Sequence, residues 1–309
     1  MVQQTTTIQK EIKKLREQFM HSSDFTVKEI PWGSGKQAIL CFYSSLVKKS
    51  EVESNLNLLR LAKRTISYEN PETRIDEVIG NRTTTFDDSV TITTEAYNNE
   101  KLIDYICNGE TLVILLHTQE MIRLDSPDFV HRTPDEPENE HVLRGSHEGL
   151  VENFDSNVSL IRKRIKNNKL IVKKLILGKE TKTVAYYFYV EDIVDKEALK
   201  TVEERLQAIE LDMFYSVGQL SDYLDDQVWS PFPQLLNTER PDRVVANILE
   251  GKIAIMTDVS PTALIGPVTF FSFYQSPDDF NARVLVGTFY RIMRIFSFLS
   301  AIFLPAFYI

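Results

Sequence analysis

The strongest constraint on the fold is an internal repeat. In the first copy an apolar stripe at helical spacing is formed by Ile8, Ile12, Leu15 and Phe19. The same stripe returns 146 positions later as Phe154, Val158, Ile161 and Ile165. Apolar residues at this spacing predict one buried face of a helix. A fold made of two copies of one module is therefore our first expectation.

The elements after this helix also recur in the same order. After this helix, each copy continues with a short run of alternating apolar and polar residues, then an apolar strand, then a helix rich in acidic residues and leucine. A further helix follows, ended by Gly109 or Gly251, and the next segment is a strand. The paired segments are 24–33 with 169–178, 38–43 with 185–190, 46–61 with 193–209, and 93–116 with 237–256. Glycine suits the left-handed residue that ends a helix. We predict an α/β fold of two related modules with mixed sheets, against the alternative of chance similarity between generic α/β sequences.

The repeat also suggests domain boundaries. Residues 1–130 form the first predicted subdomain and 151–285 the second, with the start of a transmembrane segment at 286–309. Between the subdomains, residues 131–150 are acidic and contain Pro134 and Pro137. This composition is typical of a linker.

Bulk composition narrows the function classes. The chain has 309 residues, of which 43% are hydrophobic and 26% charged, so it is long enough for two cores. Its net charge of -9 argues against a nucleic-acid binder that neutralises phosphates. Cys41 and Cys107 lie in apolar surroundings without ligand-like spacing, which indicates buried thiols in a reducing compartment. The polar N-terminus carries no secretory signal pattern.

The C-terminal sequence is strongly apolar. After Arg291 and Arg294 it reads IFSFLSAIFLPAFYI. This run is shorter than the roughly 20 residues of a membrane span, so we interpret it as the start of one. Two arginines before a span favour a cytoplasmic location for the preceding domain. A buried C-terminal helix of a soluble protein is the alternative.

No sequence motif indicates catalysis. We find no nucleophile elbow, no Cys/His pairing and no metal-ligand spacing, and expect neither an enzyme nor a cofactor. The basic run LIRKRIKNNKLIVKK at 160–174 is interpreted as the solvated face of a helix, with Arg162, Lys163 and Lys166 exposed. An anionic lipid or a partner subunit is its functional alternative.

The stretch SPFPQLLNTERPDRV, 230–244, is unusual because it places three prolines around a charged string. We interpret Thr238 as a helix N-cap, Glu239 as a first-turn acid and Pro241 as a first-turn proline. Arg240 has no counterpart in the first copy, so this structural interpretation leaves it unexplained.

From about residue 141 onward the sequence resembles the A subunit of the GerA family of bacterial spore germinant receptors. The matching strings are LRGSHEGLVENFDSNVSLIRKRI, SPFPQLLNTERPDRVVANILEGKIAIMTDVSP and PVTFFSFYQSPDDF. The resemblance implies a nutrient-sensing protein of the spore inner membrane whose hydrophilic domain faces the spore core. It also implies a transporter-like B subunit and a lipoprotein C subunit as partners, with a homo-oligomer as a further option. Most of the family's membrane domain is absent from this chain.

Two functions follow as hypotheses. In the first, a cleft between the modules binds an amino acid or sugar through charged side chains, and the candidates are Arg144, Glu148, Asn157, Arg162, Glu239, Arg240, Asp258 and Ser260. In the second, the same residues pair within or between subunits, and the domain is a scaffold or relay. A soluble α/β enzyme is the third. For a ligand-binding Arg240, replacement by alanine should block the germination response and leave the melting temperature nearly unchanged.

Overall fold

The computed structural model describes residues 2–32, 36–57, 83–86, 90–124, 140, 148–214, 216–225, 233–274 and 284–308. Two compact units make up the chain. Unit 1 comprises Met1–Arg132 and Val158–Lys173, and unit 2 comprises Thr133–Asn157 and Lys174–Ile309. Each unit is therefore made of two separate stretches of the sequence. The predicted boundaries, by contrast, assign one continuous stretch to each of the two sheets.

The first module is a six-stranded sheet in the order β1-β2-β5-β6-β4-β3. Its strands are β1 (Phe25–Pro31), β2 (Gln37–Tyr43), β3 (Thr83–Phe86), β4 (Val90–Ala96), β5 (Thr111–Leu115) and β6 (Glu120–Leu124). All neighbouring strands pair antiparallel. The helices are α1 (Val2–Gln18), a helical segment at 49–57, and α4 (Asn99–Cys107).

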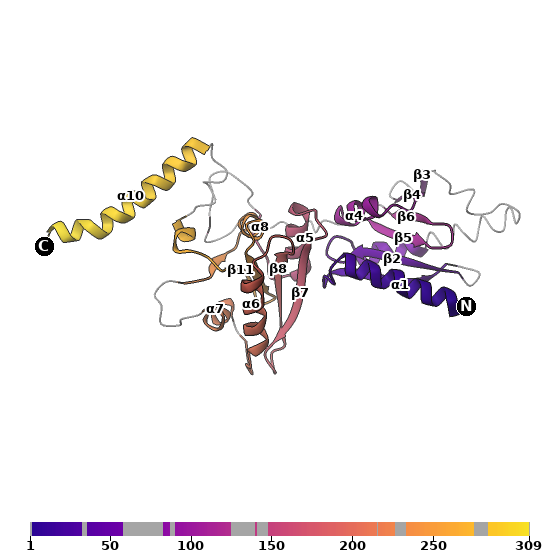
Figure 1. Ribbon diagram of the computed structural model, residues 1–309, viewed down its shortest axis with the longest axis horizontal. Coiled ribbons are helices and arrows are strands. Elements are labelled where there is room, and N and C mark those ends of the chain that lie inside the picture. Colours follow the sequence, from indigo (N-terminus) through magenta and orange to yellow (C-terminus); the bar gives the residue numbers. More distant parts are fainter. Residues whose placement is uncertain are drawn as a thin grey trace, which may run out of the picture. The chain divides into compact units, whose positions relative to one another are not determined.

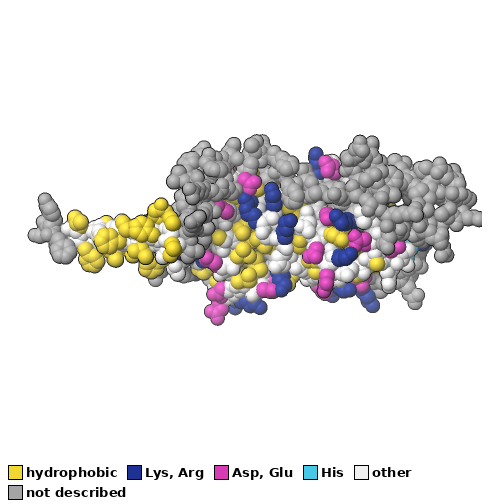
Figure 2. All heavy atoms as spheres, turned by 90° about the horizontal axis from the view of Figure 1, so that it is seen from above, with side chains coloured by type: hydrophobic (Ala, Val, Ile, Leu, Met, Phe, Trp, Pro, Cys, Tyr) yellow, Lys and Arg dark blue, Asp and Glu magenta, His cyan; other side chains and the backbone are white. Residues whose placement is uncertain are grey.

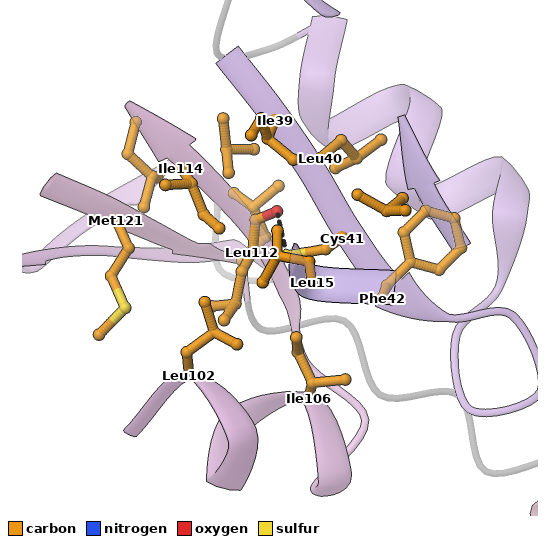
Figure 3. Close-up of a cluster of buried hydrophobic side chains, with 14 of the residues drawn as sticks. Leu15, Ile39, Leu40, Cys41, Phe42, Leu102, Ile106, Leu112, Ile114 and Met121 are labelled. Carbon is orange, nitrogen blue, oxygen red and sulfur yellow. Dashed lines mark hydrogen bonds between the residues drawn. The ribbon is translucent and has the colours of Figure 1, made fainter. Parts of the chain in front are cut away.

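The core of this module lies where α1 and α4 meet the central strands. Leu15 of α1 and Leu102 and Ile106 of α4 converge on β2 and β5 (Figure 3). Within that cluster the Cys41 thiol donates to the carbonyl of Leu112 at 3.7 Å. Five consecutive residues of β5 are buried, as expected for a strand that is covered on both faces.

The second module is a five-stranded sheet in the order β7-β8-β10-β11-β9. Its strands are β7 (Leu170–Leu177), β8 (Thr183–Val190), β9 (Leu236–Thr238), β10 (Ile253–Thr257) and β11 (Ser260–Gly266). The pairs β8–β10, β10–β11 and β11–β9 are antiparallel. Its helices are α5 (Phe154–Arg164), α6 (Lys196–Ala208), α7 (Val217–Leu224) and α8 (Pro241–Leu249), all labelled in Figure 1.

The predicted duplication into two similar modules is confirmed, although residues 58–61 of the predicted helix 46–61 lie outside the described residues. The repeated stripe runs along α1 and α5, and its last members, Phe19 and Ile165, follow directly after these helices. The stripe residues Ile12, Leu15, Phe19, Val158, Ile161 and Ile165 are buried. The sheet order β1-β2-β5-β6-β4 corresponds to β7-β8-β10-β11-β9. Gly109 and Gly251 follow α4 and α8 with φ of 87° and 91°, as the helix-ending role predicts. At Gly251 a Cβ would lie 2.7 Å from the Ile193 carbonyl oxygen, so a side chain is excluded there.

The C-terminal helix α10 begins two residues before the predicted segment 286–309 and is longer than the apolar run that follows Arg294. α10 runs over Val284–Tyr308, because the residues before Arg291 are helical too. Its stretch Leu285–Leu304 has the 20 residues and the apolar character needed to cross a membrane. Hydrophobic side chains cover the visible face of α10 (Figure 2), and Leu285 is 85% exposed. This exposure disfavours the alternative of a buried helix in a soluble core.

Candidate functional site

Arg240, between β9 and α8, and Asp242, in the first turn of α8, form an ion pair inside unit 2. Arg240 is only 1% exposed, and its guanidinium grips the Asp242 carboxylate at two points, Nε to Oδ1 at 3.1 Å and Nη2 to Oδ2 at 2.7 Å. A third nitrogen, Nη1, donates to the Glu140 carbonyl oxygen at 3.3 Å. Such a two-point pair fixes both position and orientation. Arg240 therefore connects the start of α8 to the distant residue 140.

The Glu140 side chain binds the same turn from the other side. Its carboxylate accepts from the Thr238 hydroxyl, from the Glu239 amide at 3.3 Å, and from the Arg243 guanidinium. We call Glu140, Thr238, Arg240, Asp242 and Arg243 the Glu140 cluster. Two arginines and two carboxylates compensate one another there, so the charges are paired where burial would otherwise make them costly.

The predicted capping roles in this turn are partly wrong. Thr238 is the last residue of β9, and Arg240, which makes no side-chain capping bond, occupies the N-cap position. Glu239 therefore precedes the helix, and the acid of the first turn is Asp242. Pro241 does lie in the first turn. Thr238 and Thr94 nevertheless occupy equivalent strands, β9 and β4, which supports the alignment of the two copies.

The Glu140 cluster is connected to the C-terminal helix through a short 3-10 helix, η1 (Phe270–Tyr274). Arg243 donates to the Ser272 carbonyl oxygen at 3.5 Å. Two ring contacts join η1 to α10, because Phe298 lies 5.7 Å from Phe270 and 5.0 Å from Tyr274 between ring centroids. Arg294 of α10 also donates to the Tyr274 carbonyl oxygen. A continuous series of contacts thus runs from α8 to α10.

A second buried charge cluster lies in unit 1. Asp24, 1% exposed, accepts from the hydroxyls of Ser22 at 2.8 Å and Ser45 at 2.9 Å. Arg162 of α5 reaches the same carboxylate with Nη2 at 2.7 Å and with Nε. The guanidinium also lies 3.7 Å from the centre of the Tyr43 ring, a cation–π distance. We call Ser22, Asp24, Tyr43, Ser45 and Arg162 the Asp24 cluster.

The predicted exposure of Arg162 is wrong, since this side chain is 2% exposed. Position 162 lies four residues after Val158 and three before Ile165, which puts it on the apolar face of α5. Lys163 and Lys166 are exposed as predicted. Burial by itself lowers the pKa of Arg162, but the Asp24 carboxylate outweighs that effect and the net pKa is raised. The guanidinium therefore stays charged and paired.

The remaining candidate residues lie in different environments. Asn157 is buried and its side chain bonds to the backbone of Val151 in both directions. Glu148 is partly buried, and the Glu239 carbonyl accepts from the Leu150 amide at 2.8 Å. Asp258 is exposed at the β10–β11 turn and accepts from the Val184 amide at 3.1 Å, while Ser260 bonds to Thr262. Arg144 lies outside the described residues.

Unit 2 therefore brings Glu239 and Arg240 together, whereas Arg162 belongs to unit 1. Sequence reasoning missed Asp24, Glu140 and Arg243, which complete the two clusters. Asp242 could have been identified from the sequence as a partner of Arg240, because it follows Arg240 by two positions in the same string. Glu140 stands about a hundred positions away from its partners, and no local pattern marks it. Among the described residues no group of three or more His, Cys, Asp or Glu side chains could hold a metal ion.

Comparisons with known proteins agree with this architecture. Residues 13–309 match the family model described as Bacillus/Clostridium GerA spore germination protein. Spore germination protein GerLA of Bacillus cereus is 31% identical over 96% of this chain and 59% of its own length. Spore germination protein A1 of Bacillus subtilis (strain 168) is 31% identical over 87% of this chain and 53% of its own. The chain thus spans somewhat more than half the length of these relatives.

A solved structure shows the same fold. The crystal structure of the N-terminal domain of the A subunit of the Bacillus megaterium spore germinant receptor GerK3 matches with a TM-score of 0.59 and 24% identity. The match covers 83% of this chain and 93% of that one. With two duplicated modules, an apolar C-terminal helix and a family model that matches nearly its whole length, this chain belongs to the GerA family of spore germination proteins.

Proposed function

We propose that this chain is the N-terminal part of a germinant-receptor A subunit and that unit 2 relays a signal to the membrane through α10. The main observation that supports this proposal is the series of contacts from the Glu140 cluster through η1 to α10. A displacement of Arg243 acts on the Ser272 carbonyl, and η1 passes it to Phe298 through two ring contacts. Coupling of this kind needs contiguous packed groups, and these residues provide them.

The surroundings of the candidate residues favour a relay over direct nutrient binding. Arg162 and Arg240 are 2% and 1% exposed, and their guanidinium groups are held by Asp24 and Asp242. To bind a nutrient carboxylate, Arg162 would have to leave the buried Asp24 carboxylate without a counter-charge, which is costly. Arg240 would have to give up both of its hydrogen bonds to Asp242. The same residues are well suited to fix the geometry of the units in which they lie.

The location and partners of the chain form part of this proposal. α10 would form the start of a span of the spore inner membrane, with Arg291 and Arg294 on the spore-core side by the positive-inside bias. A transporter-like B subunit and a lipoprotein C subunit would complete the receptor, and a nutrient bound elsewhere in that assembly would supply the signal.

The relay is tested by removing one contact between η1 and α10. Phe298→Ala in the full-length receptor deletes both ring contacts to η1. We expect spores with this variant to lose the nutrient-triggered release of ions, at receptor levels equal to those of the parent by immunoblot. The matched control is Phe296→Ala on the same helix, a 64% exposed ring, which should leave the response intact.

Two results would contradict the relay. One is a normal response of the Phe298→Ala spores. The other is a selective rise in the melting temperature of this chain with one amino acid, sugar or nucleoside. At a hundred times its dissociation constant a bound ligand adds about 2.7 kcal/mol to stability. That shift would assign nutrient binding to this domain and restore the first hypothesis.

A further inference from the structure

The 3-10 helix η1 presents aromatic rings on two different sides. Phe270 and Tyr274 pack against Phe298 of α10. Ser272 is buried, and its carbonyl accepts from Arg243. Phe271 and Phe273 are 64% and 36% exposed. The Phe271 ring is therefore largely exposed and the Phe273 ring partly exposed, on a segment whose other residues contact α8 and α10.

The position of η1 along α10 identifies what could cover these rings. Arg294 binds the Tyr274 carbonyl and Phe298 packs on η1, so η1 lies beside the turn 294–298 of the candidate span. The charged side chains of Arg291 and Arg294 are costly at the centre of a bilayer, but not near its surface. The favourable placement therefore puts this turn, which lies in the middle of Leu285–Leu304, at the membrane surface, with the part of α10 after it in the bilayer. η1 then lies at the surface as well.

Aromatic residues are enriched at this depth. Phenylalanine on a short amphipathic segment inserts its apolar ring between headgroups and acyl chains, while the polar side faces the protein. Interfacial aromatic residues and arginines together fix the depth and tilt of a membrane helix. The two exposed rings belong to the same short helix whose Tyr274 carbonyl accepts from Arg294, so η1 combines aromatic rings with an arginine, as expected at the interface.

We propose that η1 is a membrane-interface anchor in which Phe271 and Phe273 insert at the boundary between the lipid headgroups and the acyl chains. This inference rests on the proposed role of α10 as a membrane helix. It adds that unit 2 touches the bilayer at a second point, so the relay from the Glu140 cluster passes through a segment held by lipid. A bilayer is favoured over a protein partner because the candidate span itself packs on η1.

The experiment measures the depth of single nitroxide labels. Phe271→Cys is labelled in the whole chain, reconstituted in vesicles of phosphatidylcholine and phosphatidylglycerol, and relaxation is compared between oxygen and a water-soluble nickel chelate. The native cysteines do not interfere: Cys41 is fully buried and Cys107 6% exposed. Burial raises the pKa of these thiols to about 12 and about 11 respectively, so they remain protonated.

Two reference positions make the result decisive. Ile176→Cys on β7 matches Phe271 closely, with 63% against 64% exposure, and should report water. Phe303→Cys on α10, 57% exposed, should report lipid. Phe273→Cys repeats the measurement should the first variant fold poorly, as judged by its melting temperature. We expect the ratio of oxygen to nickel accessibility to be severalfold higher at 271 than at 176.

Each of the other possible results contradicts a different part of the proposal. A lipid signal at 303 with a water signal at 271 and 273 rejects the anchor and leaves α10 in the membrane. A water signal at 303 rejects the membrane helix of the proposed function, and the anchor with it. Labels at 271 that are hidden from both reagents indicate that a second protein chain covers η1, which also rejects a lipid contact.

Discussion

Two buried arginines, Arg162 and Arg240, dominate the polar interior of the described chain. A buried ion pair is itself a weak source of net stability, because both charges lose their hydration on folding. Removing one partner is a different matter, since the other charge then stays buried alone. The two arginines should therefore be sensitive to replacement in proportion to how deeply their carboxylate partners are buried.

Arg162→Ala should strongly destabilise the protein. The side chains of Arg162 and Asp24 are 2% and 0% exposed, so the substitution leaves a carboxylate without a counter-charge in the interior. We expect a loss of about 3–5 kcal/mol in the free energy of unfolding. Urea denaturation measures it. Lys163→Ala, at an exposed neighbouring position on α5, should stay within about 0.5 kcal/mol of the parent.

The double variant gives the sharper check. If the pair acts as a unit, Asp24→Ala combined with Arg162→Ala should cost clearly less than the sum of the two single changes. Additive losses would mean that the two side chains stabilise the protein independently, in conflict with their shared hydrogen bonds.

Arg240→Ala should also lower stability, by a smaller amount. Its partner Asp242 retains a side-chain exposure of 30%, so water can solvate the released carboxylate. The loss of hydrogen bonds to charged groups is worth about 2–3 kcal/mol, and the melting temperature should fall by roughly 5 °C or more. Lys200→Ala breaks only an exposed pair with Glu204 and should change little. An unchanged melting temperature for Arg240→Ala would return Arg240 to the ligand-binding candidates.

The local sequence pattern explains why the burial of Arg162 could have been predicted from the sequence and the burial of Arg240 could not. Residue 162 falls on the stripe of Val158 and Ile165, so helical spacing alone predicts burial. Its partner Asp24 is 138 positions away, and only the fold brings the two together. For Arg240 even burial was not predictable, since it stands in a turn where no periodicity applies.

At the scale of elements, the repeat predicted what periodicity and glycine geometry determine. Helices with a clear stripe, strands with apolar runs and the glycines after α4 and α8 are all in their expected places. The start of α10 lies within two residues of the predicted segment 286–309, although Arg291 and Arg294 interrupt its apolar run, because arginine is a good helix former. The segment η1 was missed, because FFSFY reads equally well as a strand.

At the scale of the whole molecule, the sheets and the compact units do not coincide. The second copy contributes Val158–Lys173 to unit 1. This segment is tied there by more than Arg162: the Ser23 amide donates to the Val172 carbonyl at 2.7 Å and the Asn168 side chain donates to the Gln18 carbonyl at 3.1 Å. Unit 1 should therefore require residues that the repeat assigns to the other module.

Truncation should reveal this dependence. A chain of residues 1–173 should unfold cooperatively in urea and resist protease, whereas a chain of residues 1–132 should be much less stable. The shorter chain loses the ion pair between Asp24 and Arg162, and also the hydrogen bonds from the Ser23 amide to Val172 and from Asn168 to Gln18. Loss of one partner of a buried ion pair alone costs about 3–5 kcal/mol, which is a large share of the stability of a small domain.

Asp24→Asn separates the two causes of that loss. In the chain of residues 1–173 it should destabilise by several kcal/mol, because Arg162 then stays buried without a counter-charge. In the chain of residues 1–132 the same substitution should be nearly neutral, because no Arg162 is present and water can reach position 24. Equal effects of Asp24→Asn in both chains would show that residues 158–173 do not complete the Asp24 cluster, and that the first copy folds as the repeat alone suggests.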